Sequence, residues 1–184
     1  MGLRDRHNQR KEERREFGIG GTAARFQMRQ KMLALGDDFW IENGDGQRVY
    51  RIDGKVLRLR HTMIFEDAQG EKLCKIQTRV MHIRDTMAIE DADGNKMASV
   101  HQALITPIRE RWKVDVENGE DLEIHGNIVD HEYTIEADGD KVAEVSKRWF
   151  RVRDTYGVQV GPTASPVLIL AVSAALDAMA HPAK

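Results

Sequence analysis

The sequence predicts a mainly β protein in which a closed antiparallel barrel surrounds a buried hydrophobic helix at the C-terminal end of the chain. Three observations predict this fold: a hairpin phrase that recurs along the chain, an alternation of apolar and polar residues between its copies, and one wholly apolar segment near residue 170. The barrel follows from the last two. A helix without a polar side must be covered on every side, and the apolar side of the sheet is the surface available to cover it.

The hairpin phrase begins with an apolar and an acidic residue, passes through a short polar turn that contains glycine, and returns to an apolar residue. Its copies occupy residues 41–49, 65–73, 89–97, 116–122 and 135–142. The Asp-Gly and Gln-Gly pairs stand where a tight hairpin needs a positive φ angle, which glycine adopts without steric cost. Each copy therefore predicts two antiparallel strands joined by a turn in water.

The alternation between the turns has a period of two residues over residues 26–160, where a helix would show a period of 3.6. It is clean over residues 57–60 and recurs over residues 73–78, 112–117 and 142–147. One side of such a strand is apolar and the other is polar, which is typical of antiparallel sheets with a single covered face. The spacing of the turns predicts roughly ten to twelve strands, as in a sandwich or a barrel.

The apolar segment is expected to be a helix that begins at Pro166. Ser165 can accept a hydrogen bond from the free amides of the first turn, and proline suits the first helical position. Residues 167–172 are all apolar, and Ser173 can bond to a carbonyl one turn earlier. β-branched residues leave a buried strand as the alternative, but the alanine-rich continuation favours a helix. Asp177, the first charge, is expected to mark where the helix leaves the interior.

The dimensions of the helix and of the sheet agree. An eight-stranded barrel has room only for its own side chains, so enclosing a helix about 10 Å across requires more strands. A helix over residues 166–180 would be about 22 Å long, and strands of about six or seven residues reach the same length at about 3.3 Å per residue.

The domain organisation follows from composition. Residues 1–24 combine many charges with almost no apolar residue, which predicts a flexible charged tail; residues 25–181 are expected to form the barrel domain and residues 182–184 a second tail. Of the 184 residues, 41% are apolar, as in a globular domain. The net charge is −2, which excludes strong bulk attraction to nucleic acid, so anion binding must depend on a local patch.

The sequence predicts a cytoplasmic protein. Cys74 is the only cysteine, so no internal disulfide marks a secreted domain. The first six residues lack the apolar segment of a signal peptide, and the apolar run at residues 167–176 is about half the length of a membrane span. No transmembrane segment is therefore expected, and any association with a membrane would be peripheral.

The order of several segments resembles the LURP-one-related family, which belongs to the tubby C-terminal-like superfamily together with the phospholipid scramblases. The segments that carry the resemblance are residues 28–31, 49–52, 124–133, 145–150 and 154–158 and the apolar helix of residues 168–179. The resemblance covers residues 26–180 and rests on the order of these segments along the chain.

The family implies a closed barrel of about twelve strands around a C-terminal helix, the architecture that the periodicity also predicts. By analogy of fold it implies two kinds of activity. Tubby-type barrels bind phosphoinositide headgroups through basic side chains, whereas scramblases move lipids between leaflets and are often regulated by calcium. The resemblance carries no functional residue onto this sequence, so the candidate sites come from the residues themselves.

Basic residues in two segments are candidates for binding a phospholipid headgroup. Arginine and lysine at alternating strand positions would form a positive stripe on one outer face, and a phosphate needs several such donors. The alternative is a solvated strand face whose cations guard against edge pairing. The segment 145–153 has no acidic residue. The candidates are Lys147, Arg148, Arg151, Arg153, Lys75 and Arg79.

The histidines, the acidic segment at residues 91–95 and the cysteine are interpreted as structural residues and not as a metal site or a nucleophile. His125 and His131 flank a turn and could in principle bind a metal, but a second pair at ligand spacing is missing, so both are expected to be ordinary strand-end histidines. Residues 91–95 resemble the start of a calcium loop but lack its closing glutamate, and are expected to be a hairpin turn. Cys74 lies in an alternating strand and is expected to be a packed thiol. No catalytic residue, metal site or cofactor is predicted.

The sequence favours a non-enzymatic module that binds an acidic phospholipid headgroup or a protein partner at a membrane surface, with no nucleic acid. One alternative is a scramblase-like lipid-handling protein, in which the C-terminal helix leaves the barrel and inserts into the bilayer. A second alternative is an enzyme that acts on a small ligand near the barrel mouth, which the absence of a recognisable acid, base and nucleophile set disfavours.

Overall fold

The computed structural model describes residues 23–29, 39–53, 56–57, 60–81, 84–103, 111–149 and 155–181. Within these residues lie thirteen strands, the short 3-10 helix η1 (Lys147–Trp149) and the α-helix α3 (Pro166–Ala180). The strands are β1 (Ala24–Arg29), β2 (Phe39–Asn43), β3 (Arg48–Asp53), β4 (Val56–Leu57), β5 (Arg60–Asp67), β6 (Lys72–Met81), β7 (Arg84–Asp91), β8 (Lys96–Ala103), β9 (Arg111–Val116), β10 (Leu122–Asn127), β11 (Glu132–Ala137), β12 (Asp140–Ser146) and β13 (Thr155–Val160).

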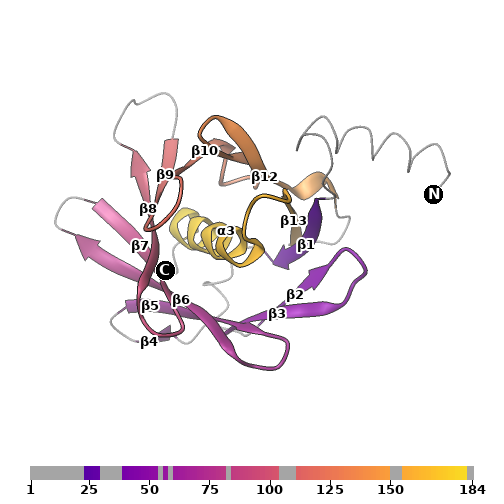
Figure 1. The fold of residues 1–184 in the computed structure, drawn as a ribbon, viewed down its shortest axis with the longest axis horizontal. Coiled ribbons are helices and arrows are strands. Elements are labelled where there is room, and N and C mark those ends of the chain that lie inside the picture. Colours follow the sequence, from indigo (N-terminus) through magenta and orange to yellow (C-terminus); the bar gives the residue numbers. More distant parts are fainter. Residues whose placement is uncertain are drawn as a thin grey trace.

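Twelve of the described strands form a closed antiparallel ring (Figure 1). Each strand of the ring pairs with its two neighbours, and the ring closes because β1 pairs with β13 and β3 pairs with β5. The short β4 lies outside the ring and pairs with β5. The predicted barrel is thus confirmed. Its closure removes the exposed edges that an open sheet would leave.

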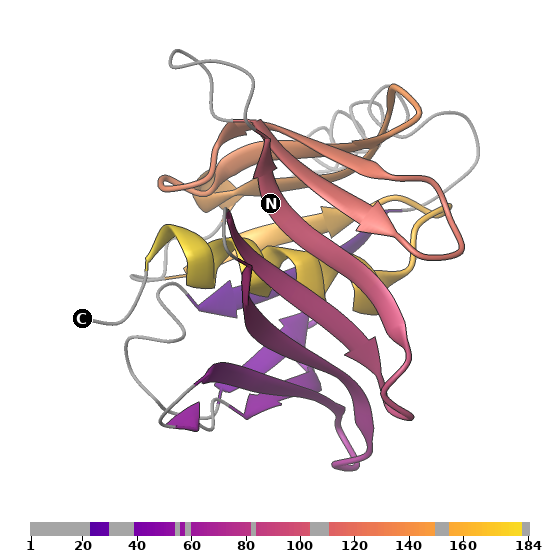
Figure 2. The ribbon, with the colours of Figure 1, turned by 90° about the vertical axis from the view of Figure 1, so that its left-hand side faces the viewer.

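The helix α3 runs along the axis of this ring, with strands on all sides of it (Figures 1 and 2). Residues 169–178 are all buried. The helix begins as predicted, since Ser165 Oγ accepts a hydrogen bond from the Leu168 amide at 3.4 Å. Ser173 Oγ donates to the Ile169 carbonyl oxygen at 2.9 Å, so its hydroxyl needs no water. Among the described residues, no helix combines the length and the apolar character that crossing a membrane requires.

Asp177 does not mark the point where α3 leaves the interior, contrary to the prediction from its charge. The residue is 1% exposed, and Ala178 after it is also buried. The physical reason is a partner inside the barrel: His131 Nε2 lies 2.7 Å from Asp177 Oδ1. A hydrogen-bonded carboxylate can stay in the interior, where an unpaired one would be too costly.

The hairpin turns gather at one end of the barrel, called here the hairpin end. Successive strands of the ring run in opposite directions, so the connections alternate between the two ends. The turns that follow β2, β5, β7, β9 and β11 therefore fall at the end where α3 begins (Figure 2). The opposite end, called the loop end, carries the turn at residues 128–131, η1 and the C-terminal end of α3.

Three of the hairpin turns share one hydrogen-bonding pattern. Asn43, Asp67 and Asp91 each accept, through Oδ1, hydrogen bonds from the amides two and four residues later, at 2.8–3.0 Å. The segment 91–95, which resembles a calcium loop, is one of them. Its Gly94 has a φ of 91°, as a tight hairpin of this kind requires. The prediction of hairpin turns at these positions is confirmed.

Replacing Leu170 with aspartate is expected to abolish cooperative folding, because Leu170 is fully buried and the charge would lie unpaired in the barrel axis. Leu170→Ala, which only removes side-chain volume, is expected to lower the free energy of unfolding by about 2–5 kcal/mol. Urea unfolding followed by circular dichroism measures both effects.

The matched control is Leu168→Asp, because the Leu168 side chain is only half-buried at the hairpin end. This variant is expected to keep a cooperative transition. If Leu170→Asp unfolded cooperatively at the midpoint of the parent protein, α3 could not be enclosed as described.

Candidate functional site

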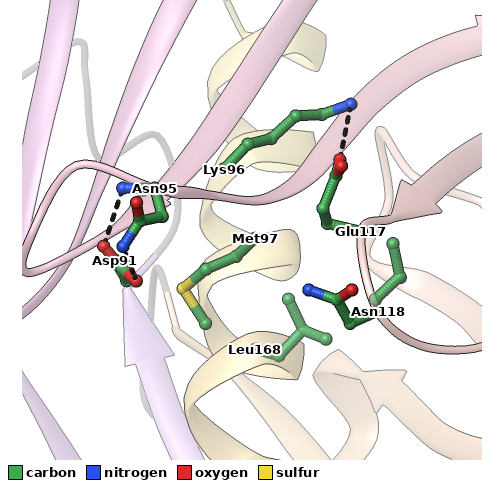
Figure 3. A pocket seen from close by; sticks show the side chains of 8 residues that line it. Asp91, Asn95, Lys96, Met97, Glu117, Asn118 and Leu168 are labelled. Carbon is green, nitrogen blue, oxygen red and sulfur yellow. Dashed lines mark hydrogen bonds and ion pairs between the residues drawn. The ribbon is translucent and has the colours of Figure 1, made fainter.

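A recess of about 680 Å³ opens at the hairpin end, beside the first turn of α3 (Figure 3). Met97, Val116 and Leu168 give it an apolar lining. The remaining lining residues are Asp91, Asn95, Lys96, Glu117 and Asn118.

The charged side chains of the recess are engaged with their neighbours. Lys96 Nζ lies 3.3 Å from Glu117 Oε2, and Asn95 Nδ2 donates a hydrogen bond to Asp91 Oδ2 at 3.0 Å. Hydrogen bonds from the Asn95 side chain and from amides of the turn hold the pKa of Asp91 below its ordinary value. The recess therefore offers apolar contact beside charged side chains that are already paired with one another.

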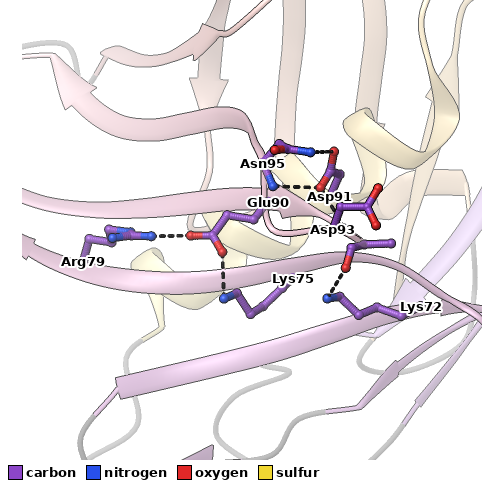
Figure 4. Close-up of polar contacts among 8 residues, drawn as sticks. Lys72, Lys75, Arg79, Glu90, Asp91, Asp93 and Asn95 are labelled. Atoms are coloured by element: carbon purple, nitrogen blue, oxygen red, sulfur yellow. Dashed lines mark hydrogen bonds and ion pairs between the residues drawn. The ribbon is translucent and has the colours of Figure 1, made fainter.

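Lys75 and Arg79, two of the predicted headgroup ligands, share a counter-ion on the outer face of the barrel (Figure 4). Glu90 on β7 stands opposite Lys75 in the register of β6 and β7. Lys75 Nζ lies 2.7 Å from Glu90 Oε2, and Arg79 pairs with Oε1. The hydrogen bond from Lys75, supported by Arg79 and opposed by burial, lowers the pKa of Glu90. Glu90 is thus ionised at neutral pH and offsets one of the two positive charges.

Lys147 and Arg148 form η1 together with Trp149 at the loop end. None of the three residues is buried, and the Arg148 side chain is 83% exposed. Glu132 braces the turn, because its carboxylate accepts hydrogen bonds from Ser146 Oγ at 3.0 Å and from the Lys147 amide at 3.1 Å. The same carboxylate lies 3.5 Å from Arg148 Nε. The backbone of η1 is therefore fixed, with Arg148 exposed and Lys147 and Trp149 half-buried.

The described candidates fall into two separate groups, Lys75 with Arg79 and Lys147 with Arg148. The strand β6, which carries Lys75 and Arg79, lies across the ring from β12 and β13, which flank η1. The strands β7 to β11 separate the two groups on one side, and β5, β3, β2 and β1 separate them on the other. One headgroup could not contact both groups. Arg151 and Arg153 lie outside the described residues.

His131 is not an ordinary strand-end histidine, contrary to the sequence-based prediction. It is buried and has a φ of 53°. Its Nε2 lies 2.7 Å from Asp177 Oδ1, and His181 Nδ1 lies 3.3 Å from the same oxygen. Among the described residues, these three form the group that could hold a metal ion, and His125 is not part of it.

Sequence reasoning missed this cluster because His131 and Asp177 are 46 residues apart. Only the position of α3 in the barrel axis brings the two side chains together. The sequence does contain one signal, which is a charged residue inside an otherwise apolar helical run. Aspartate is almost never fully buried without a partner, so a predicted buried position for Asp177 would itself have called for a partner elsewhere in the chain.

Cys74 is a packed thiol, as predicted. It is fully buried on β6. Burial raises its pKa to about 12, against a smaller opposite effect of Lys72. Cys74 is therefore protonated at neutral pH and lacks the thiolate that nucleophilic attack or metal binding requires.

A sequence model of the LURP-one-related family matches residues 24–177, which span the ring of strands and most of α3. No curated protein matches the chain. Among solved structures, the X-ray structure of a protein from Arabidopsis thaliana is similar, with a TM-score of 0.61 and 13% sequence identity, covering 84% of this chain and 91% of that chain. At this identity the likeness concerns the fold alone.

Glu90→Gln is expected to lower the free energy of unfolding at neutral pH by about 1 kcal/mol, the upper part of the range for ion pairs that water partly screens. The pKa of Glu90 in the folded protein lies below the ordinary value of 4.5. Its contribution to stability is therefore present above pH 4.5 and is lost as the pH falls through the folded-state pKa. Urea midpoints of parent and variant should converge as the pH is lowered from about 7 to about 3.

The matched control for this prediction is Glu117→Gln, which removes the partner of Lys96 from a pair in which both side chains are half exposed. It is expected to change the midpoint little at any of these pH values. A difference between Glu90→Gln and the parent that stayed constant down to low pH would refute the assigned role of Glu90.

Proposed function

Because the chain belongs to the LURP-one-related family, we propose that it is a non-catalytic barrel module of that family that docks on anionic phospholipid membranes. The observation that carries the proposal is η1, where Lys147, Arg148 and Trp149 stand at the loop end without a buried residue. Lysine and arginine attract anionic lipid, and tryptophan is enriched at the level of the headgroups. The three side chains together have the composition of a membrane-docking turn.

The free energy of membrane binding expected from η1 is small, which suits reversible, peripheral binding. A lysine or arginine near an anionic membrane surface contributes about 1 kcal/mol, so the two cations of η1, one of which Glu132 offsets, contribute about 1–2 kcal/mol. The net charge of the chain is −2, so long-range attraction of the whole molecule does not add to this. The attraction acts over a Debye length of about 8 Å at physiological ionic strength, and binding should therefore weaken as salt is added.

Glu132 prepares η1 for docking. Its hydrogen bonds with Ser146 Oγ and the Lys147 amide fix the backbone of the turn in the free protein. A turn that is already ordered loses little conformational entropy when it binds. Glu132 offsets one positive charge of the turn, and its contact with Arg148 is made through Nε at 3.5 Å, while the Arg148 side chain stays 83% exposed.

The Lys75–Arg79 pair is less suited to headgroup binding. Both cations are directed at Glu90, and a phosphate would have to compete with a carboxylate that is already in place. The pair also lies across the ring from η1. We therefore assign docking to the loop end, and the cations of β6 to stabilising the outer face of the sheet.

Lipid scrambling by release of α3 is not part of the proposal. Residues 169–178 would have to leave the contacts that bury them on all sides, and the apolar interior of the ring would become exposed. Exposing each large apolar side chain costs about 1.5–3 kcal/mol, so several of them exceed the stability of a typical domain. Docking through η1 needs no opening of the barrel.

The double variant Lys147→Glu/Arg148→Glu is expected to bind anionic membranes at least about tenfold more weakly than the parent, because it removes about 1–2 kcal/mol of attraction and adds repulsion. The measurement is flotation with vesicles of phosphatidylcholine that contain phosphatidylserine, at low and at physiological salt. The parent should float with the anionic vesicles, more at low salt, and should not float with vesicles of phosphatidylcholine alone.

The matched control is Lys96→Glu/Lys113→Glu, which changes the net charge by the same amount at residues that pair with Glu117 and Glu123 away from η1. It is expected to float nearly as well as the parent. No flotation of the parent at low salt would refute the proposal, and so would an equal loss in both double variants.

A further inference from the structure

A polar cluster lies inside the loop end of the barrel. His131 comes from the turn at residues 128–131, and Asp177 and His181 come from the C-terminal end of α3. One ligand atom from each of the three side chains lies within 4.8 Å of the others. Two imidazole nitrogens and a carboxylate oxygen are the donor types that zinc and related ions bind in proteins.

The carboxylate of Asp177 stands where a positive charge is favourable. Its side chain is fully buried, and it belongs to the last turn of α3, where the helix dipole is negative. A buried anion at this place is costly unless donors or a cation balance it. His131 Nε2 at 2.7 Å and His181 Nδ1 at 3.3 Å both lie near the same carboxylate oxygen, and His181 Nδ1 lies equally far from the Asp177 carbonyl oxygen. Neutral imidazole nitrogens are the commonest metal ligands in proteins.

Two buried polar atoms beside the carboxylate lack a hydrogen-bond partner among the described residues, namely His131 Nδ1 and the Tyr156 hydroxyl. Both residues are almost completely buried, and their rings lie 4.3 Å apart. Buried polar atoms normally have hydrogen-bond partners. The cluster therefore contains polar atoms that packing of the core alone does not require.

The backbone holds His131 toward the cluster in an uncommon conformation. Its φ of 53° lies in the left-handed region, which few residues other than glycine adopt. The turn before it is tight: the His131 amide donates to the Ile128 carbonyl oxygen at 3.0 Å, and a Cβ on Gly126 would stand 2.5 Å from the Glu132 carbonyl oxygen. Backbone strain of this kind persists where the surrounding structure fixes it, and it is concentrated at ligand sites.

We propose that His131, Asp177 and His181 bind a first-row transition-metal dication of the Zn²⁺ type, which fastens the C-terminal end of α3 to the turn at residues 128–131. Zinc bonds of about 2.0–2.1 Å in a tetrahedral site place the ligand atoms about 3.3 Å apart. The separation of His181 Nδ1 and Asp177 Oδ1 already has this value, at 3.3 Å. His131 Nε2, at 2.7 Å from the same oxygen, would have to move outward by about half an ångström.

The types of ligand atom determine which ion fits the site, and the solvent exposure of the ligand side chains determines the route by which an ion enters it. Ca²⁺ takes about six to eight oxygen ligands, and Mg²⁺ requires octahedral oxygen coordination, so one carboxylate and two imidazoles suit neither. The His181 side chain is 16% exposed, whereas those of His131 and Asp177 are at most 2% exposed. An ion would therefore reach the site past His181, and water can occupy the fourth position.

The test uses the full chain after treatment with a chelator and dialysis. Isothermal titration calorimetry with ZnCl₂ should show one saturable site per chain, and saturating Zn²⁺ should raise the midpoint of thermal unfolding by about several degrees, because the ion binds the folded state. CaCl₂ and MgCl₂ should cause no shift. These readouts do not depend on membrane binding, so their failure is separable from a failure of the docking proposal.

Two variants remove one ligand each. His181→Gln changes the partly exposed ligand at the end of α3, and His131→Asn removes the buried one with a residue that tolerates the left-handed conformation. Loss of an outer-shell partner alone lowers metal affinity about 10–100-fold, so both variants, which lose a ligand itself, are expected to bind Zn²⁺ at least about 100-fold more weakly or not at all. Circular dichroism checks that they fold. The matched control is His101→Gln, because His101 Nδ1 faces the single carboxylate of Asp115 at 3.6 Å; it should bind like the parent.

Two results would overturn the proposal. The first is the absence of saturable Zn²⁺ binding by the parent, which would leave the cluster as a hydrogen-bonded histidine–aspartate pair only. The second is binding by folded His181→Gln with the affinity and stoichiometry of the parent, which would place the bound ion elsewhere on the chain.

Discussion

Residues 169–178 of α3 are buried on every side of the helix, and the rest of the molecule is arranged to meet that requirement. A sheet can cover a cylinder on all sides only by closing around it. Closure around a helix about 10 Å across needs more strands than a barrel filled by its own side chains, which the closed ring supplies. Because side chains of α3 occupy the axis, polar chemistry is confined to the outer wall and to the two ends.

The antiparallel path of the chain makes those two ends different. At the hairpin end, the acceptor side chains are used within the turns themselves, as Asp91 shows by accepting from two amides of its own turn. The described connections at the loop end are not copies of one another, and they include η1 and the turn that carries His131. Both proposals place their chemistry at the loop end, on η1 and on the turn that carries His131.

Features fixed by neighbouring residues could be predicted from the sequence, as Ser165 at the start of the helix shows. Lys75 marks the limit of such reasoning, because the alternation places it on the outer face but its counter-ion Glu90 depends on the register of the next strand. The contact of His131 with Asp177 depends on the closed barrel as a whole. It joins residues 46 apart, and it forms only when the closed barrel holds α3 at one height along its axis. Asp177 was therefore expected in water, where an aspartate without a known partner normally lies.

His131 and Glu132 are neighbours in the chain, yet their side chains serve the two features of the loop end separately. His131 reaches Asp177 inside the barrel, while Glu132 reaches η1 and accepts from the Lys147 amide. A displacement of the backbone at these two residues would disturb both features at once. Arg148 and His181 each take part in one of them, since the first contacts Glu132 and the second contacts Asp177. The two proposed activities, membrane docking and metal binding, can therefore be tested one at a time, although one turn of backbone supports the residues of both.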